Sequence, residues 1–321
     1  MMSDIEREAL IKQLRKLAIT KQLNFLIGSG ASFPAIPLMG MIDAENDDER
    51  NSKLASKVRE TSKSLLLECS VLNHDEEIVF KSYLKFLSVV LAMLNLANSR
   101  QIPKNVNIFT TNYDLFIEKS IDTIIQNDRL VFNDGANGYL TRYLDSTNYN
   151  RLVSYKGLND NYINEIPSLT LIKPHGSVNW KRHNEKIQIK NEIVENPVIV
   201  EPTGLESQET FLNNHFHEML RAFQLELDKP QSVLFVIGFS FQDKHIGKMI
   251  KRAVQNPELM VYVFGYSDDD KDIYLENLEF NERRNFKVLT PRDFGEKYEN
   301  FTLSNLTDIL SATTMEDLKD D

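Results

Sequence analysis

The stretch Leu23-Asn24-Phe25-Leu26-Ile27-Gly28-Ser29-Gly30-Ala31-Ser32 decides the fold of this chain. Its first half is short and mostly apolar, as expected of a buried β-strand, and it runs directly into a loop with two glycines. A strand that ends in a glycine loop is typical of the βα turn in an open parallel sheet. Residues 3–18 show helical periodicity, with Ser3 and Glu6 spaced as a capping box. The chain is therefore expected to begin with a helix that leads into the first strand.

Further strand-like runs alternate with helical patterns, which favours an α/β fold with a doubly wound parallel sheet. The additional strands are predicted at residues 106–109, 169–172, 197–200, 233–237, 260–264 and 286–289. The helices that separate them include residues 113–125, 208–227 and 243–254. We expect one domain over residues 1–321.

Three regions depart from this alternation. Residues 43–103 contain no convincing strand and are interpreted as a helical insertion; within them, residues 84–96 are apolar on nearly every face. Such a helix is either buried between layers or used in a homo-oligomer interface. Residues 128–166 are rich in Asn, Tyr, Asp and Gly, which predicts loops and small helical structure, and residues 313–321 form an acidic tail that is expected to be loosely ordered.

Composition excludes several classes of protein. The net charge of -10 over 321 residues argues against a general nucleic-acid-binding surface, because phosphate neutralisation needs clustered Lys and Arg. The single Cys69 excludes an internal disulfide framework and a four-cysteine zinc site. Residues 1–22 do not resemble a secretory signal, and the longest apolar-rich run, 86–96, is about half the length that spans a bilayer. A cytoplasmic protein without membrane contact is expected.

The glycine loop is the first of four candidate site motifs. Backbone amides at Gly28, Ser29 and Gly30 could approach a phosphate closely, and a following helix N-terminus would favour its negative charge. The third glycine of the dehydrogenase fingerprint is missing, and Phe33 and Pro34 stand there instead. A plain tight turn is the alternative.

Two further motifs follow predicted strands. In Thr110-Thr111-Asn112-Tyr113-Asp114, Asn112 would face the ligand crevice, where a carboxamide can hold a ribose hydroxyl or a water, although Asn112 or Asp114 could merely cap the next helix. In Pro174-His175-Gly176-Ser177, His175 has a near-neutral reference pKa that suits proton transfer, although a lone histidine is more often structural.

The fourth motif, Gly238-Phe239-Ser240-Phe241-Gln242-Asp243, joins a predicted strand to a predicted helix. Gly238 and Ser240 could hold a second phosphate or an adenosine ribose, and Asp243 is either a helix cap or a ligand. His215 and His217 lie two apart on a predicted helix, on different faces, so a shared metal is not expected. No metal site is predicted anywhere in the chain.

The four motifs in this order, together with Ile36-Pro37, resemble the sirtuin family over residues 20–292. The resemblance implies a Rossmann-like domain that binds NAD and cleaves its nicotinamide glycosidic bond. Asn112 and His175 match the family's catalytic asparagine and histidine, and Asp114 matches the residue that contacts the nicotinamide amide. The remaining NAD-binding residues implied by the resemblance are Gly28, Ser29, Gly30, Ala31, Ser32, Thr111, Gly238 and Ser240.

The chain also departs from the usual sirtuin pattern. Ala35 stands before Ile36-Pro37 where glycine is common, the following Asp-Phe-Arg is absent, and one cysteine cannot build the zinc ribbon. These departures look like the zinc-less sirtuin-like NADases of bacterial anti-phage defence, which hydrolyse NAD to nicotinamide and ADP-ribose. That resemblance implies NAD as substrate, no zinc, and a partner such as a HerA-type ATPase or other sensor subunit. An NAD-dependent lysine deacylase and a non-hydrolysing NAD or ADP-ribose sensor remain the alternatives.

Overall fold

The computed structural model describes residues 3–67, 71–96, 103–155, 165–200, 214–295 and 298–311. Cys69, residues 208–213 of one predicted helix and the acidic tail at residues 313–321 lie outside these ranges. None of the described helices is long and apolar enough to cross a membrane.

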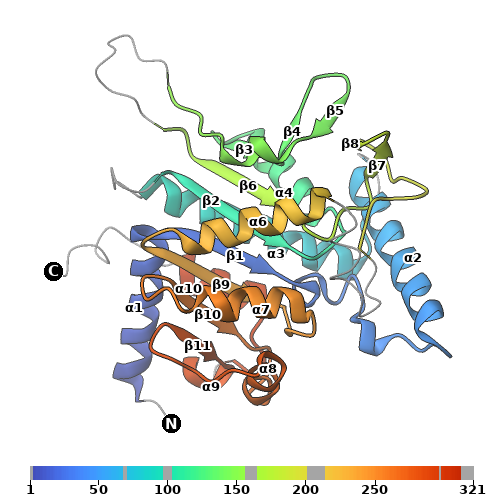
Figure 1. The fold of residues 1–321 in the computed structure, drawn as a ribbon. Coiled ribbons are helices and arrows are strands. Elements are labelled where there is room, and N and C mark those ends of the chain that lie inside the picture. Colours follow the sequence, from blue (N-terminus) through green and yellow to red (C-terminus); the bar gives the residue numbers. More distant parts are fainter. Residues whose placement is uncertain are drawn as a thin grey trace.

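A seven-stranded parallel sheet forms the centre of the molecule, which confirms the predicted α/β fold (Figure 1). In order across the sheet, its strands are β11 (Phe286–Leu289), β10 (Met260–Phe264), β9 (Ser232–Ile237), β1 (Gln22–Ile27), β2 (Asn105–Thr110), β6 (Ser168–Ile172) and β3 (Val131–Asn133). The strand order reverses between β1 and β9, and the crevice at such a reversal is where ligands bind in sheets of this kind.

Helices cover both faces of the sheet, because successive strand residues point to opposite sides. Phe25 and Ile27 of β1 belong to one buried cluster, while Leu26 belongs to the other. The first cluster packs under α1 (Asp4–Thr20), α3 (His74–Leu96), α4 (Phe116–Ile125) and α10 (Leu303–Ser311). The second packs under α6 (Asn214–Asp228), α7 (Lys244–Ala253) and α8 (Asp270–Leu278).

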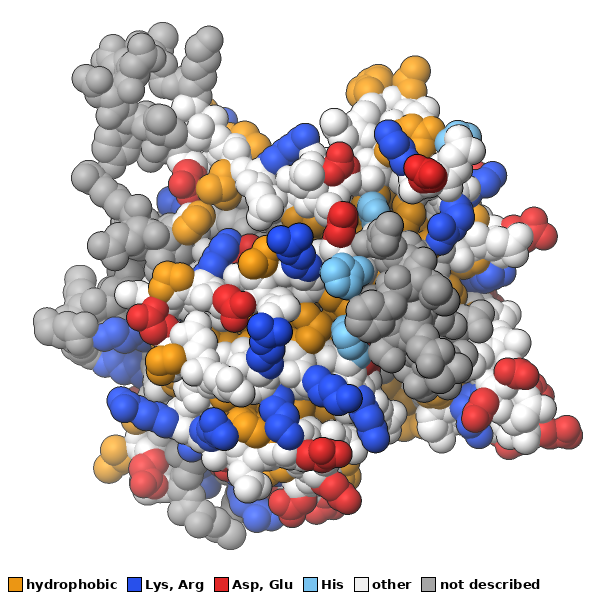
Figure 2. All heavy atoms as spheres, viewed as in Figure 1, with side chains coloured by type: hydrophobic (Ala, Val, Ile, Leu, Met, Phe, Trp, Pro, Cys, Tyr) orange, Lys and Arg blue, Asp and Glu red, His pale blue; other side chains and the backbone are white. Residues whose placement is uncertain are grey.

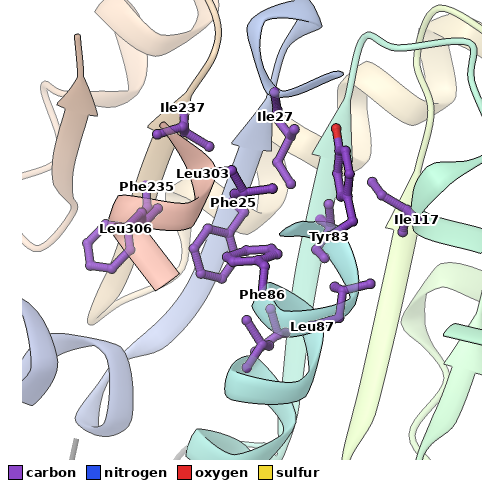
Figure 3. Close-up of a cluster of buried hydrophobic side chains, with 14 of the residues drawn as sticks. Phe25, Ile27, Tyr83, Phe86, Leu87, Ile117, Phe235, Ile237, Leu303 and Leu306 are labelled. Carbon is purple, nitrogen blue, oxygen red and sulfur yellow. The ribbon is translucent and has the colours of Figure 1, made fainter. Parts of the chain in front are cut away.

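Helix α3 packs against one face of the sheet, within the first cluster. Phe86 lies against Phe25 with the ring centroids 5.0 Å apart (Figure 3). Val90 is fully buried. Asn73 and Glu76 form the capping box at its start. One face of α3 is thus buried within the chain, while Ile78 on another face is 46% exposed. Its use in a homo-oligomer interface stays a prediction.

Residues 128–166 differ from the prediction of loops and small helices. Besides η3 (Ser146–Asn150), they contain β3 at the edge of the main sheet and two strands of a separate antiparallel sheet. In order, that smaller sheet consists of β4 (Ala136–Asn137), β5 (Arg142–Leu144), β8 (Lys186–Ile189) and β7 (Trp180–His183). The prediction failed because such short strands lack a measurable period, and β5 pairs with a strand far along the chain, Arg142 opposite Ile189.

The predicted strand at residues 197–200 is also wrong, because Ile199 makes only an isolated antiparallel bridge with Gly176. The predicted insertion at residues 43–103 contains α2 (Asp47–Leu66) and α3, and η2 (Met39–Met41) precedes it. Its status as an insertion stays a prediction. Helix α2 lies beyond the carboxyl ends of the main strands, at the right of Figure 1.

The two loops at the strand-order reversal pack against each other through their backbones. Gly238 has φ +67°, and a Cβ on it would lie 2.5 Å from the Ala31 nitrogen. A Cβ on Gly28 would lie 2.4 Å from the Gly238 oxygen. Both glycines are therefore required by the close approach of η1 (Ser29–Ser32) and the turn after β9.

We expect Gly238→Ala to lower the free energy of unfolding by about 1–3 kcal/mol, because alanine is strained at positive φ and its Cβ meets backbone. Gly40→Ala is the matched control, since nothing lies within 4 Å of a Cβ at that position. Urea titrations of both variants measure the difference. Equal stability of the two variants would contradict the packing argument.

Candidate active site

The four sequence motifs form a closed ring of contacts at the carboxyl ends of the strands. The Gly30 amide donates to the Gly238 oxygen at 2.9 Å, and Asn112 Nδ2 donates to the Gly28 oxygen at 3.0 Å. The Ser177 hydroxyl donates to the Tyr113 oxygen at 3.3 Å, which joins the second motif to the third. His175 in turn contacts Asp243, in the same turn as Gly238.

Several glycine-loop amides are already engaged within the protein. The Gly28 amide donates to the Ile237 oxygen, the Gly30 amide to Gly238, and the Ala31 amide to Gly28. These three amides therefore hold the loop in place, which is a different role from the phosphate contacts that the glycine pattern predicted. Ser29 and Gly30 are exposed, so this end of η1 remains on the solvent side of the ring.

Asn112 is 7% exposed, and its amide nitrogen is fixed from several sides. Nδ2 donates to the Gly28 oxygen at 3.0 Å and to Ser32 Oγ at 3.2 Å, and it lies 3.5 Å from Tyr83 Oη. The backbone amide of Asn112 donates to Thr110 Oγ1 at 3.1 Å. Its Oδ1, by contrast, has no hydrogen-bond partner among the described groups. The side chain thus presents one oriented, unused carbonyl acceptor.

Asp114 and Ser32 continue this network. Ser32 Oγ donates to Asp114 Oδ2 at 2.8 Å and lies 3.1 Å from Tyr83 Oη. Because Ser32 has a single hydroxyl proton, Tyr83 is the donor in that second contact. Asp114 Oδ1 also accepts from the Phe116 amide at 3.2 Å, but the N-cap of α4 is Leu115, so the predicted cap at Asn112 or Asp114 is wrong.

The electrostatics of this network follow from its burial. Desolvation raises the pKa of Asp114, although the Lys173 charge lowers it. Burial, followed by the charge of Asp114, raises the pKa of Tyr83 well above its ordinary value, so its hydroxyl stays protonated as a donor. Lys173 Nζ donates to Glu118 Oε1 at 2.9 Å and to Ser177 Oγ at 3.1 Å, and it also donates to the Asp114 oxygen. One buried cation therefore connects the second and third motifs.

His175 sits on a tight turn that is fixed by the segment beyond β8. The Val200 amide donates to the His175 oxygen at 2.8 Å, and Gly176 has φ +89° with a would-be Cβ 2.0 Å from the Val198 oxygen. His175 Nε2 lies 3.0 Å from Asp243 Oδ2, with the side chains 10% and 11% exposed. Asp243 Oδ1 caps α7, which confirms the cap, whereas a ligand contact of Asp243 stays a prediction.

The remaining predicted residues lie around the ring. The Thr111 amide donates to the Ile27 oxygen at 3.3 Å, and the Ser240 oxygen accepts from Asn277 Nδ2 at 2.8 Å. A cavity of about 400 Å³ is lined by residues of α2 together with Tyr113 and Ile199, whereas Asn112 and His175 are not in its lining. It therefore borders the second motif at Tyr113.

The other histidines do not form a recognisable metal centre. Within the described ranges, no group of three or more His, Cys, Asp or Glu side chains is placed to hold a metal ion. Figure 2 shows several histidines close together on the face over α6 and α7, among Lys and Arg side chains. His245 lies near Asp243, His175 and His217, and burial lowers the pKa of His245.

Sequence reasoning missed Tyr83 and Lys173. Tyr83 comes from α3, and its hydroxyl points toward the carboxyl ends of the strands in Figure 3. Nothing in the sequence connects Tyr83 with Asn112, because only tertiary packing places α3 under the site. Lys173 offered one signal, since it directly precedes Pro174-His175 at a predicted strand end.

Comparison with known proteins identifies the family. The model of the SIR2-like domain matches residues 106–282, more than half of the chain, and so includes the second, third and fourth motifs. No curated protein matches the chain. SIR2-like domains generally use NAD, and the sirtuin resemblance is confirmed at the level of the family. The glycine loop lies before the matched residues, but its contacts with Asn112 and Gly238 make it part of the same site. The chain belongs to the SIR2-like domain family.

Proposed function

We propose that the protein is an NAD hydrolase (NAD+ nucleosidase) that releases nicotinamide and ADP-ribose. The observation that carries this proposal is the buried Asn112, whose Nδ2 is fixed while its Oδ1 has no partner. A buried acceptor without a donor costs about 1–3 kcal/mol, and a bound donor at Oδ1 would recover that cost. A water or a ribose hydroxyl is the donor that fits a carboxamide oxygen.

The chemistry follows from the bond to be broken. When the bond between the ribose C1′ and the nicotinamide nitrogen breaks, its electron pair leaves with the nicotinamide, which becomes neutral. The ribose then has oxocarbenium character, and a water oxygen adds to C1′ while one water proton is transferred to a base. Asn112 holds the water or the ribose hydroxyl, and His175 takes the proton.

The residues around the ring fit the two ends of NAD. Asp114, buried beside Asn112, is a suitable acceptor for the carboxamide of the nicotinamide. Ser29 and Gly30 are exposed at the end of η1, and Gly238 and Ser240 are half-buried in the turn opposite. These positions would contact the pyrophosphate and the adenosine half, while Gly28, Ala31, Ser32 and Thr111 shape the site from within.

In the cell, we propose that the enzyme depletes NAD as a cytoplasmic effector of anti-phage defence. Unregulated NAD hydrolysis is toxic, so a control device is required. A homo-oligomer, and a separate sensor such as a HerA-type ATPase, would supply that control. This part of the proposal is based on the resemblance to zinc-less sirtuin-like NADases.

Two other functions make different predictions about NAD. A lysine deacylase consumes NAD only when an acylated substrate is present, whereas a sensor binds NAD or ADP-ribose without hydrolysis. The chain has one cysteine, so it cannot form the four-cysteine zinc site of deacylases. The fixed Asn112 amide favours chemistry over binding alone.

Product analysis separates these three functions. We expect the purified protein, incubated with NAD and no peptide, to form nicotinamide and ADP-ribose in equal amounts by liquid chromatography. Addition of an acyl-lysine peptide should not change the rate. Consumption that depends on the peptide would indicate the deacylase, and NAD protection against thermal unfolding without products would indicate the sensor.

Replacement of either central residue should nearly abolish hydrolysis. We expect Asn112→Ala and His175→Ala to lower kcat by about 10²- to 10⁴-fold, because each removes a group that acts on the reacting water. His183→Ala is the matched control, since His183 is exposed on β7 and should leave the rate unchanged. Circular dichroism verifies folding. Wild-type turnover by folded His175→Ala would exclude His175 as the base.

The size of the active species tests the proposed regulation. We expect light scattering of the purified chain to give the mass of a dimer or larger oligomer of the 37.1 kDa chain. A stable monomer with full NADase activity would contradict control by self-association and leave the separate sensor as the remaining device.

A further inference from the structure

Asp243 places one oxygen against the ring of His175. Nε2 lies 3.0 Å from Oδ2, and about nine-tenths of each side chain is buried. Oδ2 has no hydrogen-bond partner among the described groups. Nε2 of His175, at 3.0 Å, is close enough to become its donor.

The other oxygen of the same carboxylate is fixed by the backbone. Oδ1 accepts from the His245 amide at 2.8 Å and from the Ile246 amide at 3.1 Å, which caps α7. These two bonds prevent rotation of the carboxylate. The preceding turn is itself anchored, because the buried ring of Phe241 packs edge-on against Tyr274 with centroids 5.7 Å apart. Oδ2 is thus held toward His175 by the fold.

The carboxylate remains charged in this position. Burial acts to raise the pKa of Asp243, but the contact with His175 and the two helix amides outweigh it and lower the pKa below its ordinary value. The partial positive charge at the start of α7 has the same effect. An ionised carboxylate can only accept, so a hydrogen bond at this contact requires the proton on Nε2.

We propose that Asp243 is a positioning residue that holds neutral His175 as the Nε2–H tautomer, leaving Nδ1 as the atom that accepts the proton in hydrolysis. This inference rests on the proposed NADase function. In the step itself, a water O–H bond breaks, its electron pair forms the new bond to C1′, and the proton goes to Nδ1. The positively charged ring that results is then stabilised by Asp243.

Asp243→Asn tests this role without removing the helix cap. The asparagine Oδ1 still accepts from the two α7 amides, since Asn is as good an N-cap as Asp. Its Nδ2 then faces Nε2 and donates to it, which forces the proton onto Nδ1 and blocks the proposed base. We expect kcat to fall by about 10²-fold or more, while KM changes less than about threefold and the melting temperature is retained.

A double-mutant cycle distinguishes action through His175 from a separate effect. In the His175→Ala background, Asp243→Asn should cause no further loss of the residual rate. Asp269→Asn is the matched control, because Asp269 is the exposed N-cap of α8 and makes no side-chain cap bond. If Asp243→Asn fails to fold, Asp243→Ser replaces it, since serine caps a helix but is too short to reach the ring.

Nitrogen NMR of the labelled histidine ring gives a readout that does not depend on turnover. We expect the Nε2–H tautomer in the wild type and the Nδ1–H tautomer in Asp243→Asn. A wild-type Nδ1–H tautomer, wild-type kcat in folded Asp243→Asn, or an equal loss in the His175→Ala background would each overturn the proposal. If the wild type forms no ADP-ribose, the NADase proposal fails, and the tautomer still decides the role of Asp243.

Discussion

The backbone contact between the two loops at the centre of the sheet is the constraint on which the rest of the site depends. The Gly30 amide donates to the Gly238 oxygen, and no side chain fits between these loops. This contact fixes the turn after β9, and with it Asp243 and the start of α7. It also fixes η1, which positions the acceptors of the Asn112 amide. A change of one methyl group here would displace both halves of the proposed chemistry.

A buried polar network extends this constraint to the helices. Ser32 receives hydrogen bonds from Asn112 and Tyr83 and donates one to Asp114. Tyr83 belongs to α3, whose capping box and apolar face fix it against the sheet. Buried polar groups are costly unless they are hydrogen-bonded, so other orientations of these side chains would be less stable. The orientation of Asn112 thus depends on a helix that contributes no residue to the family motifs.

Each of the two sides of the site contains a buried charged side chain with polar partners. Lys173 lies among Glu118 and the backbone of Asp114, while the carboxylate of Asp243 faces His175. Each buried charge has a partner of opposite sign or a set of helix amides, which is the condition for keeping ions out of water. The result is a pair of adjacent environments: one that orients an amide and another that orients an imidazole.

The sequence by itself determined the parallel sheet, the strand ends at which the four motifs lie, and the family. Strand and helix periods are local properties of the chain, and the carboxyl ends of parallel strands necessarily meet at one edge. It did not determine the small antiparallel sheet or the bridge at Ile199. It also did not show that the amides of Gly28 and Gly30 donate to the neighbouring loop and strand. Only the tertiary structure decided the partners of Asn112 and His175, because Tyr83 and Asp243 reach them through packing between segments distant in the chain. Local patterns predict whether a residue lies on a strand, a helix or a loop. A hydrogen bond between two residues depends in addition on how two distant segments are placed relative to each other.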